Sequence, residues 1–299
     1  MHLSFCGAVW YNGRKSVLYG DFFMVYLFLA IASSVLVSVI MRLSSDRAKS
    51  RFTMLAANYL MCLAVAGCFT GFDALFPKAD GLPATLGMGA VNGVLYLASF
   101  VIYQRSVRRC GVVLSSTFMK LGLLVPMAVS VLVFWELPSP VQAAGFVIAI
   151  VAIILINAGK AEGNFSLGLI ALLIIGGGAN AMSEVFEQIG PGNLSSQFLL
   201  YTFLTAFVLC CALVVLKKER PDWVSILFGL LIGVPNYFSA RFLLLSLESV
   251  PAVIAHPTYS VVSVAAVSIL GVCVFRERLK LRQWVAMAII GCALILLNL

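Results

Sequence analysis

Residues 111–134 read GVVLSSTFMKLGLLVPMAVSVLVF, an apolar run interrupted by a single lysine. A helix needs about 20 apolar residues to cross the hydrocarbon core of a bilayer, and the stretch exceeds that length. Lys120 is its one charged residue and lies about midway along it, too deep for its side chain to reach the membrane surface easily. The stretch therefore predicts a transmembrane helix with a cation near its centre.

Nine more apolar runs of similar length accompany it. They span residues 22–41, 53–72, 84–104, 139–158, 166–187, 197–216, 223–246, 250–275 and 281–298. Of the 299 residues 62% are hydrophobic and 11% are charged, whereas a soluble domain has roughly 25% charged residues. This composition excludes a soluble enzyme, a nucleic-acid-binding domain and a disordered protein, because too few polar residues are present to cover a water-facing surface. The sequence predicts an all-α polytopic membrane protein of ten transmembrane helices.

Residues 1–21 stand apart from these runs. They contain Arg14, Lys15 and Asp21 and have no sustained apolar core, so they do not have the pattern of a cleaved signal peptide. We expect a mobile N-terminal extension. Whether residues 1–23 belong to the native protein stays open, since Met24 is an alternative start.

The lysines and arginines are unevenly shared between the two sets of loops. The loops after the first, third, fifth, seventh and ninth runs hold fifteen of the twenty: Arg42, Arg47, Lys49, Arg51, Arg105, Arg108, Arg109, Lys160, Lys217, Lys218, Arg220, Arg276, Arg278, Lys280 and Arg282. The opposite side holds Arg14, Lys15 and Lys78. Because cytoplasmic loops are enriched in basic residues, we expect a multi-pass protein of the cytoplasmic membrane with both termini outside.

Cofactor and metal signatures are missing from the sequence. Most of the eight cysteines lie in apolar runs, no C-x-x-C occurs, and the two histidines are His2 and His256. We expect no disulfide framework, no metal site and no cofactor. No G-x-x-x-x-G-K-[ST] motif is present either, so the chain offers no nucleotide site as an energy source.

The two halves of the chain resemble each other. At a shift of 141 positions, the following residues coincide without a gap: Tyr96 with Tyr237, Thr117 with Thr258, Phe134 with Phe275, Glu136 with Glu277, Gln142 with Gln283 and Asn157 with Asn298. The third and the eighth apolar runs, 84–104 and 223–246, also each hold a G-x-x-x-G, at 89–93 and 229–233. We interpret 22–158 and 163–299 as two five-helix repeats. Five is odd, so the second repeat enters the membrane from the opposite side, and the repeats are inverted.

The repeat ends carry a family resemblance. One reads Phe134-Trp135-Glu136-Leu137-Pro138 and the other Phe275-Arg276-Glu277-Arg278-Leu279. Over residues 22–299 the chain resembles the EamA-type branch of the drug/metabolite transporter superfamily. The segment Asn236-Tyr237-Phe238-Ser239-Ala240-Arg241-Phe242 also resembles a bacterial subgroup of this branch. The resemblance implies a membrane transporter. We expect no enzyme, since the sequence offers neither a nucleophile–base pair nor a carboxylate cluster at the interface. Members of the superfamily are drawn with both termini in the cytoplasm, whereas the charge distribution here favours the outside.

Polar side chains at membrane depth are the candidates for a binding site, since each costs free energy unless it is paired or hydrated. As substrate-binding residues we predict Lys120, Ser116, Thr117, His256, Thr258, Tyr259, Asn236, Tyr237, Asn92 and Tyr96. Glu184 and Arg241 are predicted as a gating ion pair near the outer helix ends, with an interfacial pair as the alternative. Lys120 has the alternative of a buried structural pair and His256 that of a core imidazole. Glu136 and Glu277 are expected to cap helix starts or to pair with loop arginines.

These residues predict a secondary-active transporter that moves a small organic solute, an amino acid or related metabolite with a carboxylate, by alternating access. The alternative is a proton-coupled exporter of lipophilic cationic drugs, which would bind its cargo on Tyr96, Tyr237 and Tyr259. The expected partners are the solute and the lipid bilayer, without nucleic acid; a coupling proton and a homodimer stay open. The sequence leaves open the substrate, the coupling ion and the direction of transport.

Overall fold

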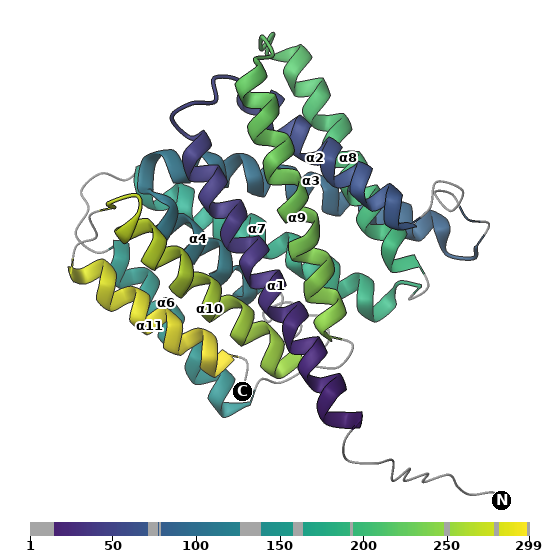
Figure 1. Ribbon diagram of the computed structural model, residues 1–299. Helices are drawn as coiled ribbons and strands as arrows, with labels where there is room; N and C mark the ends of the chain where they lie inside the picture. The colour runs from purple at the N-terminus through teal and green to yellow at the C-terminus, as the bar shows by residue number, and fades with distance from the viewer. Residues whose placement is uncertain are drawn as a thin grey trace, which may run out of the picture.

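The computed structural model describes residues 15–70, 77, 79–125, 139–157, 164–191, 194–247, 252–277 and 281–297 (Figure 1). Within them lie ten α-helices and no strand. The helices are α1 (Lys15–Ser44), α2 (Arg51–Thr70), α3 (Leu82–Cys110), α4 (Val112–Lys120), α6 (Pro140–Asn157), α7 (Asn164–Ile189), α8 (Ser195–Leu216), α9 (Trp223–Leu247), α10 (Ala252–Cys273) and α11 (Leu281–Leu297). Each coincides with one of the ten predicted runs, which confirms the all-α prediction.

Five of these helices contain stretches long and apolar enough to cross a membrane. The stretches are Val25–Ser44, Arg51–Phe69, Leu82–Cys110, Ser195–Leu216 and Trp223–Leu243. Large apolar side chains on them are exposed, for example Phe28 at 56% and Leu231 at 49%. Such exposure suits a surface that meets lipid tails, where apolar side chains carry no penalty.

Two boundaries differ from the prediction. Helix α1 begins at Lys15, so residues 15–21, expected in a mobile extension, are helical. The run predicted over 111–134 is not one uniform helix, because α4 ends at Lys120 and the chain tightens into the 3₁₀ turn η2 (Leu121–Leu123). At this turn the chain packs closely on α7, since a Cβ on Gly122 would come within 2.9 Å of the Gly177 backbone nitrogen.

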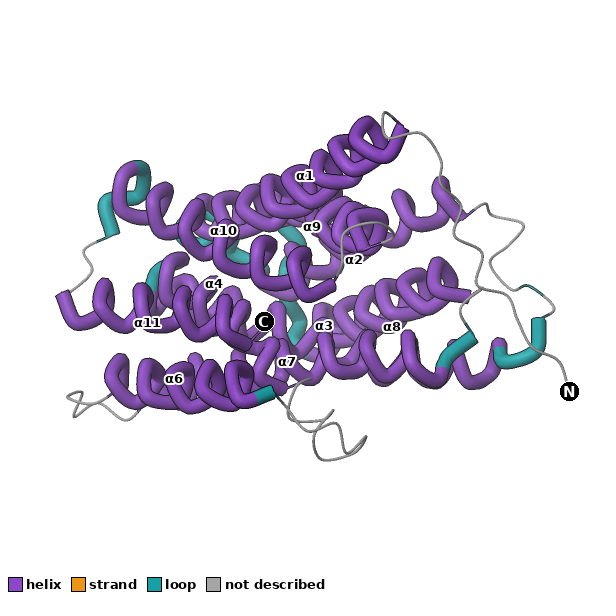
Figure 2. Tube along the Cα trace, turned by 90° about the horizontal axis from the view of Figure 1, so that it is seen from below, coloured by secondary structure: helices purple, strands orange, loops and turns teal. Residues whose placement is uncertain are grey.

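The helix contacts follow an exchange pattern: most of them recur when each helix is replaced by the helix of equal rank in the other half of the chain. Helix α9 packs against α1 and α2, and α3 packs against α7 and α8. Helix α10 contacts α1, and α7 contacts α4. The pairs α2–α8, α4–α10 and α6–α11 join helices of equal rank in the two halves. Figure 2 shows α6 and α11 on one side of the molecule and α2 and α8 toward the other.

The G-x-x-x-G motifs within α3 and α9 both lie at close helix crossings. On α3, a Cβ at Gly93 would lie 2.6 Å from the Thr202 carbonyl oxygen of α8. On α9, a Cβ at Gly229 would collide with the Met54 carbonyl oxygen of α2. Small residues thus let backbones meet where no side chain fits, which is how helices commonly associate in lipid.

The loops that follow α1, α3, α8 and α10 meet at one end of the bundle, the basic end. Arg108 donates from Nε to the Ser45 carbonyl oxygen, and the Ser50 backbone N–H donates to Asp222 Oδ1 at 3.2 Å. Arg42 Nε lies 3.5 Å from Glu277 Oε1. Four of the five loops rich in lysine and arginine are therefore neighbours; Lys160, from the remaining loop, lies outside the described residues.

Glu277 ties the start of α4 to the α10–α11 loop. Its carboxylate accepts from the backbone N–H groups of Val112 at 2.7 Å and Val113 at 3.3 Å, and it pairs with Arg42. The first N–H groups of a helix lack partners within it and carry partial positive charge, so a carboxylate there is stabilised. The prediction for Glu277 is confirmed. Glu136 lies outside the described residues.

The glycine crossings predict a position-specific response to an added methyl group. Gly93→Ala or Gly229→Ala should destabilise the protein by about 1–3 kcal/mol, because the new Cβ meets a backbone carbonyl that cannot swing aside. Gly87→Ala on α3 and Gly291→Ala on α11 are matched controls, since nothing lies within 4 Å of their added Cβ. Thermal unfolding in detergent should give a lower Tm for the first pair alone. Equal effects in all four variants would contradict the close crossings.

The Glu277 cap predicts a second stability difference. Glu277→Gln should cost about 1–3 kcal/mol, because a neutral amide replaces a charge-assisted acceptor that is 10% exposed. Asp46→Asn is the control: Asp46 Oδ2 lies 3.4 Å from Arg42 Nη1, but its side chain is 79% exposed, so the loss should be small. Thermal unfolding measures both variants. An Asp46→Asn effect as large as that of Glu277→Gln would show that Arg42 pairing, not helix capping, is what counts.

Candidate functional site

Lys120 is the last residue of α4, immediately before the η2 turn, and its ammonium lies over an aromatic ring. The Nζ atom is 3.6 Å from the ring centroid of Tyr259 on α10. A cation over the face of a tyrosine ring is attracted by roughly 0.5–2 kcal/mol, depending on how far it is desolvated. Both residues were predicted from the sequence as substrate-binding residues, and the structure brings them together.

Hydroxyl groups from two further helices complete this contact. The Tyr259 hydroxyl lies 2.8 Å from Ser239 Oγ on α9, and it also interacts with Ser34 of α1 and with the Lys120 ammonium. The Ser239 hydroxyl is 3.4 Å from the Ala30 carbonyl oxygen on α1. We call Lys120, Tyr259, Ser239 and Ser34 the ammonium cluster. Its members come from α4, α10, α9 and α1, so both halves of the chain build it.

The charge of Lys120 has no acidic partner in the part of the chain that the structure describes. Both ion pairs found there involve Arg42, which lies at the basic end. The polar groups around the ammonium are hydroxyls, which can act as donors as well as acceptors. Lys120 itself is half-buried, although α4 is contacted by α1, α3, α7 and α10. Figure 2 shows α4 between α10 and α7. The cluster is thus a cationic, donor-rich spot within the bundle.

Ser34 and Ser239 were not among the predicted site residues. The sequence offers little signal for them, because serine is small and common in transmembrane helices, where its hydroxyl usually bonds to the carbonyl one turn earlier. Ser116 and Thr117 behave in that way. Their hydroxyls donate to the Val113 carbonyl oxygen at 3.0 and 2.8 Å, and both side chains are buried. The structure therefore occupies these two hydroxyls within α4.

Asn92 and Asn236 lie at the glycine crossings. The Asn92 amide donates to Thr202 Oγ1 at 3.4 Å, joining α3 to α8. The Asn236 amide donates to Asn58 Oδ1 at 3.3 Å, joining α9 to α2. Interhelical hydrogen bonds of this kind help to hold helices together in lipid. These contacts belong to helix packing and are separate from the ammonium cluster.

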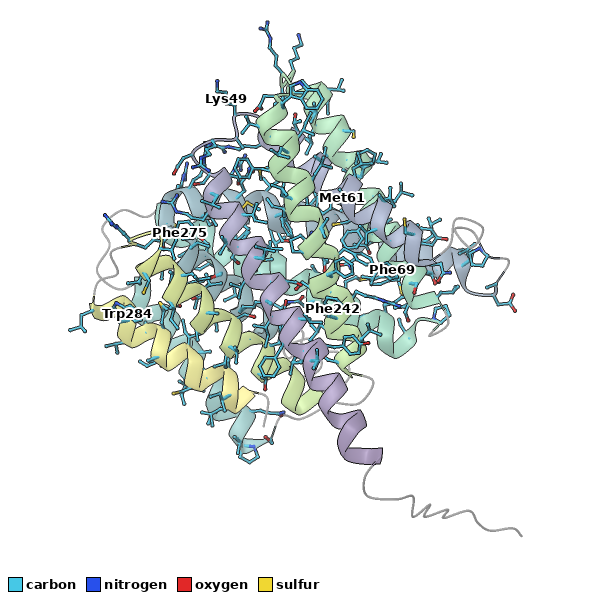
Figure 3. All side chains as sticks on the ribbon, viewed as in Figure 1. Lys49, Met61, Phe69, Phe242, Phe275 and Trp284 are labelled. Atoms are coloured by element: carbon cyan, nitrogen blue, oxygen red, sulfur yellow. The ribbon has the colours of Figure 1, made fainter. Side chains whose placement is uncertain are left out.

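The predicted tyrosines divide between two surroundings. Tyr237 is 4% exposed and stacks on Phe69 of α2 with ring centroids 5.9 Å apart, so it belongs to the packing of α2 against α9. Figure 3 labels Phe69 near the end of α2. Tyr96 meets Phe203 edge-on at 5.9 Å but also lies within electrostatic range of Tyr259. Of the two, Tyr96 is the one near the ammonium cluster.

Of four further predicted residues, the structure describes the side chains of two. Thr258 precedes Tyr259 on α10 and is half-buried, whereas the side chain of His256 lies outside the described residues. Arg241 is half-buried on α9 and interacts electrostatically with Tyr237. The backbone of Glu184 belongs to α7, but its side chain is not described. The Glu184–Arg241 gate stays a prediction. Among the described residues no group of three or more His, Cys, Asp and Glu side chains has the arrangement of a metal site.

Comparison with known proteins gives a family match in the second half of the chain. The EamA-like transporter family matches residues 165–299. An uncharacterized protein of Haemophilus influenzae is 24% identical over 276 residues, covering 86% of this chain and 92% of that protein. A protein crystal structure superposes with a TM-score of 0.61 at 16% identity, covering 92% of this chain and 97% of the other.

The solved structure shows a shared fold and, at that identity, nothing more. The family match extends from the start of α7 to the end of the chain and includes Tyr259, Ser239 and Glu277. The resemblance predicted from the repeat ends is confirmed over residues 165–299, which match the EamA-like transporter family.

Proposed function

We propose that the protein is a secondary-active transporter that carries a small organic solute with a carboxylate group across the cytoplasmic membrane by alternating access. The observation that carries this proposal is the Lys120 ammonium, held within the bundle by Tyr259 and hydroxyls and without a described acidic partner. An amino acid or a related metabolite would present the missing anion.

The chemistry of the ammonium cluster supports an anionic solute. A carboxylate that reached Lys120 would gain a charge-assisted hydrogen bond, and the hydroxyls of Tyr259 and Ser239 could turn to donate to it. The cation–π contact with Tyr259 would hold the ammonium in place while the site is empty. Such a contact is weaker than a buried ion pair, so a solute can displace it.

The exchange pattern of helix contacts supports alternating access. The pairs α1–α9 and α3–α7 correspond when the two halves are interchanged, as do α2–α9 with α3–α8 and α1–α10 with α4–α7. Two inverted five-helix repeats, 22–158 and 163–299, would produce this pattern. Halves that swap conformations expose a shared central site to one side of the membrane and then to the other.

The basic end supports the proposed orientation. Four loops rich in lysine and arginine meet there, as Arg42, Ser45, Ser50 and their partners show. We place this end in the cytoplasm and both termini outside, following the rule that basic loops stay inside. The energy source would be an ion or solute gradient, since the sequence has no nucleotide-binding motif.

Export of lipophilic cations is the weaker candidate. It would use the faces of the tyrosine rings to bind a cationic cargo. In the structure the Lys120 ammonium lies over the Tyr259 ring face, and Tyr237 is stacked on Phe69. A cationic cargo would also meet the like charge of Lys120, which disfavours binding.

Transport into proteoliposomes tests the proposal. The purified protein should take up or release amino acids or related organic anions, and Lys120→Ala should lower the rate at low solute concentration roughly tenfold or more, the equivalent of one lost charge-assisted hydrogen bond. Lys49→Ala, which removes an exposed lysine at the basic end, should transport like the parent.

Two controls make the result interpretable. The Tm of Lys120→Ala should stay near that of the parent, because no described carboxylate is left unpaired by the change. A folded Lys120→Ala protein that transports organic anions as fast as the parent would refute the proposed role. Counter-transport of protons driven by a lipophilic cation, seen as a pH change in the lumen, would favour the weaker candidate.

A further inference from the structure

The loop between α8 and α9 separates its charges by sign. Residues 217–222 read Lys-Lys-Glu-Arg-Pro-Asp, three basic and two acidic side chains. In Figure 1 this loop lies at the top of the view, beyond the ends of the other helices. By sequence its net charge is small, but in the structure the acidic side chains contact helix starts while the basic side chains are exposed.

Both acidic side chains turn inward onto helix starts. Glu219 accepts from the Ser50 hydroxyl and from the Phe52 backbone N–H at 3.0 Å, at the start of α2. Asp222 accepts from the Ser225 backbone N–H at 3.1 Å and from its hydroxyl at 2.6 Å, at the start of α9. The hydrogen bond from the Ser225 hydroxyl is the main cause that lowers the pKa of Asp222, so this carboxylate stays ionised. Neither carboxylate is free to neutralise the loop surface.

The three basic side chains remain on the outside. Lys217, Lys218 and Arg220 are all exposed, and none forms an ion pair among the described residues. Lys218 has a φ of 50°, a left-handed conformation that reverses the chain between Leu216 and Glu219. The loop therefore presents three positive charges at its outer surface. Lys49, labelled in Figure 3, is exposed near the same loop.

Large apolar side chains flank these charges. Val215 and Leu216 at the end of α8 are each 75% exposed, and Trp223 at the start of α9 is 84% exposed. The membrane-crossing stretches of the two helices end at Leu216 and begin at Trp223, so the basic loop is immediately outside the apolar core. Tryptophan beside lysine and arginine at such a boundary is typical of the lipid headgroup region.

We propose that Lys217, Lys218 and Arg220, with Trp223 beside them, form a binding surface for acidic phospholipid headgroups. The phosphates of phosphatidylglycerol or a related anionic lipid would meet the three cations, and the acyl chains would cover Val215, Leu216 and Trp223. A soluble polyanion would pair with the charges but leave the apolar side chains in water, which is why a lipid fits this surface better. The inference is independent of the transported solute.

Quenching of Trp223 by brominated lipids provides the test. Trp10, Trp135 and Trp284 are replaced by Phe, which leaves Trp223 as the one fluorophore among four tryptophans. The protein is placed in mixed bilayers in which either phosphatidylglycerol or phosphatidylcholine carries bromine. We expect stronger quenching by brominated phosphatidylglycerol, and a preference that falls as salt is raised. Equal quenching by the two brominated lipids would by itself overturn the proposal.

The variant Lys217→Gln/Lys218→Gln/Arg220→Gln makes the test local. Since each basic residue near an anionic surface contributes about 1 kcal/mol, the preference for phosphatidylglycerol should fall roughly a hundredfold, toward that of a neutral surface. The control Arg47→Gln/Arg105→Gln/Arg109→Gln removes three exposed charges from the same end and should keep the preference. An equal loss in both triple variants would show a general charge effect and contradict a defined surface.

Discussion

A cation among membrane-crossing helices needs polar partners or water, and this constraint determines which side chains surround Lys120. An ammonium in hydrocarbon costs several kcal/mol unless it is paired or hydrated. Lys120 meets the requirement with Tyr259, whose hydroxyl interacts in turn with Ser239 and Ser34. Together with Lys120, these residues come from four helices of both halves. The position of the cation therefore depends on how the halves pack, and a movement between the halves would change its surroundings.

Three of the described carboxylates help to hold the opposite part of the molecule, the basic end. Glu219, Asp222 and Glu277 lie at the basic end, and each accepts from backbone N–H groups at a helix start. Glu219 and Glu277, from the second half of the chain, cap helices of the first half. The same three groups fix the loops and leave the neighbouring lysines and arginines facing outward. One set of hydrogen bonds thus serves both helix capping and the surface charge.

Physical rules explain which features the sequence predicts well. The ten helices follow from the apolar runs that a hydrocarbon surrounding requires. Lys120, Tyr259 and Glu277 stand out because a polar or charged side chain within or beside such a run needs a polar partner. The turn at residues 121–123 was not predicted, since the apolar run continues through it, and the close approach of Gly122 to Gly177 joins residues far apart in the sequence. Ser34 and Ser239 look like any serine in an apolar run. Asn92 and Asn236 were predicted to bind solute, yet their amides join helices.

The accessibility of position 120 to water shows whether the Lys120 ammonium lies in a hydrated site. Lys120→Cys is made in a chain whose eight native cysteines are replaced, with Val151→Cys, at a 52% exposed position on α6, for comparison. Both are treated in sealed vesicles with a charged thiol reagent that does not cross membranes and with a lipid-soluble maleimide. Our account predicts that the charged reagent modifies Lys120→Cys but not Val151→Cys. Modification of Lys120→Cys by the lipid-soluble reagent alone would contradict a hydrated site at the ammonium cluster.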